Sequence, residues 1–497
     1  MTKNRYLFQK RLAYIIAIIS LSAFIQAQSC SPGMFTRQGQ VDSFKINYPG
    51  CTKINGNLTI TNNVANLDSM YEIKKVNGAL NINNSKLVDL NGLQNMESAN
   101  NLTIVNNMIL TNLQGINDIE YVGFIYLAEN KSLEDISAIS QTNYSGVLIV
   151  NCWKLKKIVG FNGAKTLSAS IIILDNFDVD TIDAFHNVDS INGRLRIDGH
   201  HKLKSLSMGE KLKYIRDDLV ITNSPLLPIL PEFPLLDNIR SLKLENLHGL
   251  QQISSFPVLS QARQDVLIQL NDKLDDISGF KKLTHIGRDL VIRQLPELSE
   301  ISGFKTLALV DRSISFDQLN KLKNLNSFAT LNQTDSIAIR TCQSLDDISG
   351  ITKLDFSKLN YLGLAGNESL SYCHYFPLCQ YLQENRGRHN ISSNKAGCNT
   401  ADEIKETCRT VSADDELVIR ITLSPNPTES DFLLTISGYV PSDGTLDIYD
   451  MMGRAVHQQP IYYGINQVDI AKFHVGTYLY QVSDGIKTLK RGKLVRI

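Results

Sequence analysis

The chain has 497 residues, and its 50 Lys and Arg residues balance its 50 Asp and Glu residues, so the formal net charge at pH 7 is zero. This balance excludes nucleic acid as the main partner, because a surface that binds a phosphate backbone shows a basic excess. The 30 glycines and 13 prolines are too few for a collagen-like or disordered chain, and a hydrophobic content of 43% is that of a folded protein.

The segment from Met1 to Ala27 has the pattern of a secretory signal. It opens with the basic residues Lys3, Arg5, Lys10 and Arg11, and a predominantly apolar run follows from Leu12 to Ile25. Such a run is too short to cross a bilayer, which takes about 20 helical residues. We therefore predict that the chain is exported and that residues 1–27 are removed after Ala27. A lipid-modified terminus at Cys30 is the alternative, although the preceding residues lack the usual leucine.

Export makes the eight cysteines informative, because disulfides persist in oxidising compartments. Cys30 and Cys51 bracket the start of the mature chain, and a second group clusters farther along: Cys373, Cys379, Cys398 and Cys408. We predict disulfide caps at both ends, with the pairing in the second group left open. Metal binding by that group is the alternative, but the group contains no Cys-x-x-Cys pair. Cys152 and Cys342 are isolated, and we expect them to be buried free thiols.

A repeat of roughly 23 residues, a length typical of stacked repeat architectures, runs through the chain between these two groups. Each unit opens with an apolar residue followed three positions later by another, and the units begin at Leu87, Leu110, Leu133, Leu155, Val179, Leu203, Leu227, Leu250, Leu274, Leu298, Leu322 and Leu345. Alternating segments such as Leu58-Thr59-Ile60 predict one short strand in each unit. Because a single unit cannot bury its leucines alone, we predict an all-β fold in which the units stack as a right-handed parallel β-solenoid.

Asparagines follow several of the predicted strands, at Asn62, Asn84, Asn106, Asn223 and Asn246. Such a row could bind a polar ligand, or it could be a buried ladder whose amides satisfy backbone groups at a tight corner. We expect the buried ladder. In our alignment Cys152 falls at the same position.

The repeat region resembles the receptor L domain family, the leucine-rich solenoids of growth-factor receptor ectodomains. The resemblance rests on Gly56-Asn57-Leu58-Thr59-Ile60 with Asn62-Asn63, on Leu-x-x-Ile-Ser-Gly units at Leu274, Leu298 and Leu345, and on Tyr48-Pro49-Gly50-Cys51 in the cap. It covers nearly all of residues 28–408, which we assign as the solenoid domain. The resemblance is specific for the fold and implies little about the ligand.

After Cys408 the repeat stops. Residues 409–416 have the composition of a polar linker, and residues 417–497 show short alternating strands separated by turn residues, as in a small Ig-like β-sandwich. This segment resembles the C-terminal sorting domain of type IX secretion in Bacteroidetes, and the matching residues include Pro425, Asn426, Pro427, Gly453, Arg454, Gly476, Tyr478 and Lys493. The resemblance implies that the secretion machinery is a partner, that the domain is removed, and that the product is released or attached to surface lipopolysaccharide.

Patterns for catalysis are scarce. The sequence contains no nucleophile elbow, no His-Glu-x-x-His and no phosphate-binding glycine loop, and we predict no catalytic residue, metal or cofactor. We expect the His200-His201 pair to lie in solvent. Acidic pairs recur in the repeat at Glu134-Asp135, Asp275-Asp276 and Asp346-Asp347. We interpret these pairs as a solvated face, although stacked carboxylates could also serve an enzyme that acts on polysaccharide.

A more specific hypothesis concerns apolar residues on the outer side of the solenoid. If Leu148, Val150, Ile172 and Leu174 point inward, their neighbours form an exposed patch, and one unit earlier two aromatic residues fall in the same columns. The predicted patch comprises Phe124, Tyr126, Val147, Ile149, Ile171 and Ile173, bordered by Arg194 and Arg196. Soluble proteins seldom expose such a patch, so it predicts a contact surface for a partner, unless a neighbouring loop covers it.

The sequence therefore predicts an exported, non-enzymatic binding or adhesion protein, secreted or held at the cell surface, whose solenoid engages a protein or glycan. The alternative is a β-helical enzyme that acts on polysaccharide.

Overall fold

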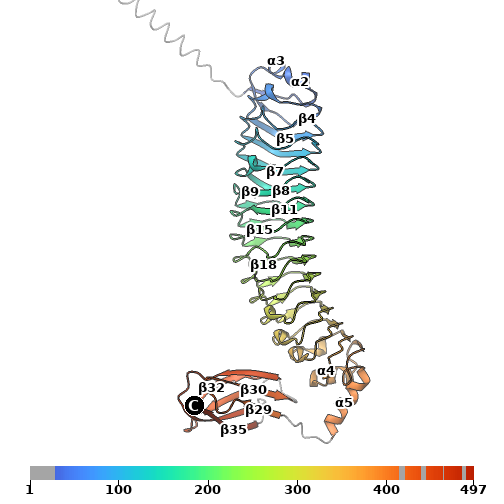
Figure 1. Cartoon of the computed structure of the whole chain (residues 1–497), viewed down its shortest axis with the longest axis vertical. Coiled ribbons are helices and arrows are strands. Elements are labelled where there is room, and N and C mark those ends of the chain that lie inside the picture. Colours follow the sequence, from blue (N-terminus) through green and yellow to red (C-terminus); the bar gives the residue numbers. More distant parts are fainter. Residues whose placement is uncertain (1–27, 414–419, 438–443, 463, 484–487) are drawn as a thin grey trace, which may run out of the picture. The chain divides into compact units, whose positions relative to one another are not determined.

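The computed structural model describes residues 28–413, 420–437, 444–462, 464–483 and 488–497, so the predicted signal segment lies outside the described residues. The chain divides into two compact units, Met1–Val188 and Asp189–Ile497. Short parallel strands in successive coils build most of both units (Figure 1), and a small antiparallel domain follows them. The predicted parallel β-solenoid and C-terminal β-sandwich are thus confirmed.

The main sheet of the first unit receives one strand from each coil. Its strands are β2 (Met34–Arg37), β4 (Leu58–Asn63), β5 (Lys75–Asn83), β6 (Ser98–Val105), β7 (Tyr121–Ala128), β8 (Asn143–Val150) and β11 (Ile171–Leu174). The pairing places Leu58 beside Leu80 and Leu80 beside Leu102. All three side chains are fully buried, so the predicted repeat is the length of one coil and its leucines fill the interior.

The opposite side of this unit is less regular. It contains the paired strands β9 (Lys157–Gly160) and β12 (Thr181–Ala184), the short strand β10 (Thr166–Leu167), and the 3-10 turns η1 (Asp68–Met70) and η2 (Ser137–Ile139).

An N-terminal cap closes the first coil. It consists of β1 (Gln28–Cys30), α2 (Gln38–Asp42), α3 (Phe44–Asn47) and β3 (Cys51–Ile54). The two short helices were not predicted, whereas the disulfide between Cys30 and Cys51 confirms the predicted cap. This bond occupies the Cys30 sulfur and so contradicts the lipid-modified alternative.

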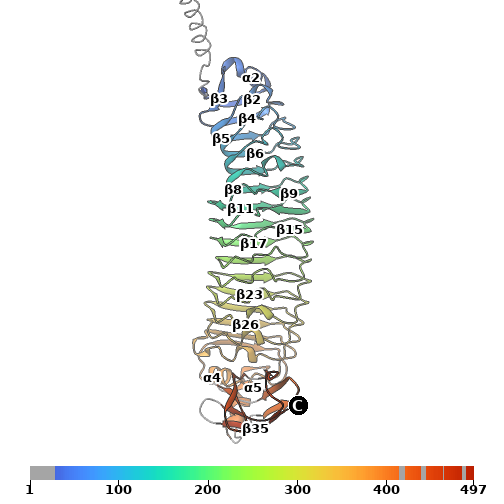
Figure 2. The same cartoon turned by 90° about the vertical axis from the view of Figure 1, so that its left-hand side faces the viewer.

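The second unit continues the same plan with a parallel sheet of one strand per coil. Its strands are β14 (Leu195–Asp198), β17 (Asp218–Thr222), β19 (Ser241–Glu245), β21 (Val266–Gln269), β23 (Asp289–Arg293), β25 (Ser313–Asp317), β26 (Ser336–Arg340), β27 (Tyr361–Ala365) and β28 (Arg388–Ser392). Figure 2 shows β17, β23 and β26 succeeding one another along this sheet.

Shorter elements complete the coils of the second unit. They are β13 (Ser190–Ile191), β15 (Ser205–Ser207), β16 (Tyr214–Ile215), β18 (Asn238–Ile239), β20 (Gln261–Ala262), β22 (His285–Ile286), β24 (Leu309–Val310), η3 (Ser302–Phe304), η4 (Asn326–Phe328), η5 (Ser349–Ile351) and η6 (Phe356–Lys358). Inside them runs a column of phenylalanines whose neighbouring ring centroids lie 5.0–5.8 Å apart: Phe233, Phe256, Phe280, Phe304 and Phe328. Equivalent residues of successive repeats thus stack on one another.

Two helices, α4 (Phe376–Gln383) and α5 (Ala401–Ala413), cap the last coils, and neither was predicted. Disulfides join Cys373 to Cys398 and Cys379 to Cys408, which settles the pairing that the sequence left open. Helix α5 continues to Ala413, so the first residues of the segment assigned as a linker, 409–413, are helical. The rest of that segment, residues 414–416, lies outside the described residues.

The C-terminal domain has two antiparallel sheets around one core. The first contains β29 (Arg420–Ser424), β30 (Asp431–Ser437) and β33 (Gly464–Asp469), and the second contains β31 (Thr445–Tyr449), β32 (Ala455–Pro460), β34 (Gly476–Ser483) and β35 (Thr488–Arg496). Strand β32 was not predicted, because its sequence Ala-Val-His-Gln-Gln-Pro carries no apolar alternation, and its residues are mostly exposed. Residues such as Phe432, Leu446 and Val468 fill the core.

The asparagine row differs from expectation. Asn62, Asn84 and Asn106 have left-handed φ angles of 55°, 53° and 56°, and their side chains are exposed. Asparagine tolerates this backbone conformation better than most residues, which explains its recurrence after the strands. The buried ladder lies one position later in the repeat and comprises Asn107, Asn130, Asn176, Asn271, Asn367 and Asn394.

Candidate functional site

Six half-buried residues form an apolar patch on the outer side of β7, β8 and β11. This outer apolar face comprises Phe124, Tyr126, Leu148, Val150, Ile172 and Leu174. Strand pairing aligns Tyr126 with Leu148, and Leu148 with Ile172. Since neighbouring strands lie about 4.8 Å apart, these side chains make a continuous column across three coils.

The structure corrects which residues make this face. Val147, Ile149, Ile171 and Ile173, which the sequence analysis placed outside, are fully buried in the coil interior. Shifting a strand by one residue moves every side chain to the opposite face. Because β8 and β11 are apolar on both faces, their alternation alone could not show which face points inward. Phe124 and Tyr126 do lie on the outer side.

The left-handed residue after each strand is the signal that gives the correct register. Asn106, Asn151 and Asp175 have φ angles of 56°, 54° and 51° in their coils. Aligning Asn151 with Asn106, instead of Cys152, turns the side chains of Val147 and Ile149 inward.

The outer apolar face ends at β7 on its N-terminal side. The column that contains Tyr126 continues toward the N-terminus through Thr103, Asn81 and Thr59, all polar. Arg194 and Arg196 were predicted to border the face, but they lie in the second unit, where Arg196 pairs with Asp198 at 2.5 Å. Their position beside the face therefore remains a prediction.

Two exposed aromatic side chains lie in the turns that follow β8 and β11, and the sequence analysis missed them. Trp153 and Phe177 are 40% and 38% exposed, and their ring centroids lie 6.1 Å apart. The Lys131 ammonium group lies 4.3 Å from the centroid of the Trp153 ring, an attractive cation–π geometry. These residues add aromatic surface to the same coils that carry the outer apolar face.

The acidic pairs have structural partners. Asp135 accepts a hydrogen bond from the backbone N–H of Ser137 at 2.8 Å, and Asp347 accepts one from Ser349 at 2.7 Å. In both cases a carboxylate accepts from the first N–H group of a 3-10 turn, which explains an acid at that position of the repeat. Asp276 similarly accepts a hydrogen bond from the Ser278 hydroxyl at 2.9 Å.

A general acid needs a raised pKa. Wherever a shift is resolved for a described carboxyl group, the pKa is lowered. At Asp218, burial opposes the shift, but hydrogen bonds from Arg240 and the charge of its guanidinium outweigh it. Within the described ranges, no group of three or more His, Cys, Asp and Glu residues could hold a metal ion.

The remaining sequence candidates are structural. His200, expected in solvent, is fully buried, whereas His201 is exposed. Cys152 and Cys342 are buried free thiols, as predicted, and burial raises the pKa of both to about 12. They occupy positions of the buried ladder, where the Cys152 N–H donates to the Asn176 side chain at 2.9 Å.

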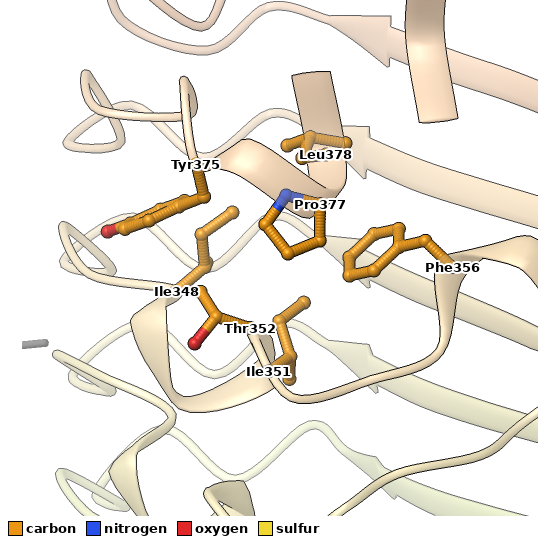
Figure 3. Close-up of a pocket in the computed structure, with 7 residues that line it drawn as sticks. All are labelled: Ile348, Ile351, Thr352, Phe356, Tyr375, Pro377 and Leu378. Carbon is orange, nitrogen blue, oxygen red and sulfur yellow. The ribbon is translucent and has the colours of Figure 1, made fainter. Parts of the chain in front are cut away.

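Two hollows in the described part of the solenoid are candidates for a ligand site. One lies where α4 meets η5 and η6 (Figure 3), and its lining is almost wholly apolar: Ile348, Ile351, Thr352, Phe356, Tyr375, Pro377 and Leu378. Its volume of about 10 Å³ is too small for an organic ligand. The other is an open polar groove of about 580 Å³ beside the N-terminal cap.

The motif residues of the C-terminal domain organise its turns. Asn426, between Pro425 and Pro427, donates to the carbonyl of Lys493 at 2.7 Å and accepts from the N–H of Val495 at 2.9 Å. Arg454 pairs with Asp450 at 2.8 Å across a turn in which Gly453 has a φ of 78°. Tyr478, two residues after Gly476, donates to the carbonyl of His474 at 2.8 Å. These contacts give the motif residues a structural role in the turns of the domain.

Comparison with known proteins gives two family matches. Residues 50–155 match the model of the receptor L domain, and residues 422–496 match that of the secretion system C-terminal sorting domain. A solved leucine-rich repeat protein from Bacteroides ovatus is 12% identical, and the match covers 68% of this chain and 91% of that one with a TM-score of 0.30. No curated protein matches the sequence. Among the described residues, no helix is both long and apolar enough to span a membrane.

The fold and the two family matches define the class of protein: a leucine-rich β-solenoid with a receptor L domain, joined to a type IX secretion sorting domain. The sorting domain places the protein at the cell surface or outside the cell, and it implies contact with the type IX secretion machinery.

Proposed function

We propose that this protein is a non-enzymatic binding or adhesion protein, which engages a protein or glycan outside the cell through the outer apolar face. The observation that carries the proposal is the alignment of Tyr126, Leu148 and Ile172 in one half-buried column. An apolar column on a strand face favours a partner that can cover it, because water solvates such a surface poorly.

The exposed rings of Trp153 and Phe177 support this assignment. Aromatic side chains are enriched where proteins bind partners, because they bury a large area at a small entropic cost. After export, removal of the sorting domain would leave the solenoid free to bind, either released or attached to lipopolysaccharide.

A test compares the exported protein with a double variant, Leu148→Asp with Ile172→Asp, on an array of surface proteins and glycans. Both side chains point away from the interior, so the coils should stay folded while binding falls by at least about tenfold. The matched control is Leu267→Asp with Val291→Asp, which changes two paired, half-buried outer residues in the second unit. Undiminished binding by the first variant would contradict the proposed surface.

The alternative, an enzyme that acts on polysaccharide, predicts depolymerisation when the protein is incubated with a polysaccharide panel. The structural hydrogen bonds that Asp135 and Asp347 accept from backbone N–H groups favour the non-enzymatic assignment. Release of reducing ends from any member of the panel would overturn it.

A further inference from the structure

The polar groove beside the N-terminal cap is distinct in position and chemistry from the outer apolar face. It lies at the ends of β2 and β4 and at the turn after β5. Its lining consists of Thr36, Arg37, Asn62, Asn63, Asn84 and Lys86. A volume of about 580 Å³ falls within the range of small-ligand sites.

Two glutamine side chains of helix α2 fix the backbone around the groove. The Gln40 side chain accepts hydrogen bonds from the N–H groups of Thr36 and Arg37, at 2.8 and 3.0 Å. The Gln38 side chain accepts from those of Ala65 and Asn66, at 2.8 and 3.1 Å. These bonds hold the cap strand and the turn after β4 in place, so the groove is preformed and a ligand need not order it.

The far side of the groove is held by the coil itself. The N–H of Lys86 donates to the carbonyl of Val64 at 2.9 Å, and Asn84 accepts a hydrogen bond from the Asn106 side chain at 2.5 Å. That bond uses the carbonyl oxygen of the Asn84 side chain, so the NH₂ group of Asn84 can donate hydrogen bonds to a ligand.

The charge of the lining is one-sided. Arg37 and Lys86 are both exposed. The described lining includes no carboxylate. Strands β2 and β5 lie on either side of β4, so the two cations come from different turns of the chain around the groove. The amide and hydroxyl groups of the lining fill the space between them.

We propose that this groove binds an acidic saccharide, a sugar chain that carries carboxylate groups. Arg37 and Lys86 suit the carboxylates of such a chain, and the amides and the Thr36 hydroxyl suit its sugar hydroxyls. A nucleic acid would need a wider basic surface than two cations, and a peptide ligand would find little apolar lining.

The experiment measures binding of tetragalacturonic acid to the exported protein by calorimetry. We expect binding that weakens with added salt, and loss of binding when the carboxylates of the probe are methyl-esterified. The double variant Arg37→Gln with Lys86→Gln should weaken binding by roughly tenfold or more, because it removes both charge-assisted contacts. Asn63→Ala should weaken binding less and leave its salt dependence unchanged.

The charge-matched control is Lys75→Gln with Lys165→Gln, two exposed lysines outside the groove, and its affinity should stay within about twofold of the parent. Equal binding of tetraglutamate or of inorganic phosphate would overturn the saccharide assignment, as would an unaffected double variant or no binding by folded protein. Failure here leaves the proposed function intact, because the outer apolar face is tested with different variants and partners.

Discussion

Replacing Asn130 by alanine tests how the buried asparagine ladder holds one coil to the next. Asn130 is fully buried, and its carbonyl oxygen accepts from the N–H and the side-chain amide of Asn107, at 3.0 and 3.1 Å. Its own NH₂ donates to the carbonyl of Ile104 at 2.8 Å. The substitution removes all three bonds to the preceding coil.

The cost follows from these contacts. A buried N–H group left without an acceptor costs ~1–3 kcal/mol, and the other two bonds contribute ~0.5–1.5 kcal/mol each. We expect a loss of about 3 kcal/mol, within a range of about 2–6 kcal/mol. Hydrogen exchange in β6 and β7 should then become roughly a hundredfold faster, because ~1.4 kcal/mol corresponds to a factor of ten.

Exchange mass spectrometry on the two strands gives the local value, and urea unfolding gives the global one. The control is Asn101→Ala, an exposed residue on the outer side of β6, which should change stability by less than about 0.5 kcal/mol. If the two variants behaved alike, the ladder would not be what links the coils.

Three further outcomes are expected. The two buried thiols should resist alkylation at pH 8 in the native protein, because burial raises their pKa to about 12, and both should react after denaturation, which thiol counting checks. Arg240→Gln should shift acid unfolding, followed by circular dichroism, to higher pH. Arg240 lowers the folded-state pKa of Asp218, so its stabilisation exists above the unfolded pKa near ~3.9 and disappears as pH falls through the lower folded value. Because Asp218 and Arg240 are partly exposed, the effect should stay below ~1 kcal/mol. Replacing Cys379 and Cys408 by serine should destabilise the C-terminal cap by ~3–4 kcal/mol, since their disulfide closes a separation of 29 residues, and limited proteolysis should then cut α5 faster.

The repeat carries most of the fold information in the sequence. Leucines that recur at the repeat interval must face a shared interior, because a single coil cannot bury them, so the repeat predicted the stacked strands. The cysteine groups predicted the two caps, and the turn residues predicted the C-terminal domain. These features depend on local pattern and on burial that repeats along the chain.

Tertiary structure decided the features that lack such a pattern. Which face of β8 points inward could not be read from a strand apolar on both sides; the left-handed backbone at Asn151 and the pairing with β7 determine it. The partners of Cys373 and Cys379 depend on how α4 and α5 fold back over the last coil, and the groove at Arg37 depends on contacts made by α2. Each of these features depends on contacts between residues of different coils. The order of residues within one repeat does not specify those contacts.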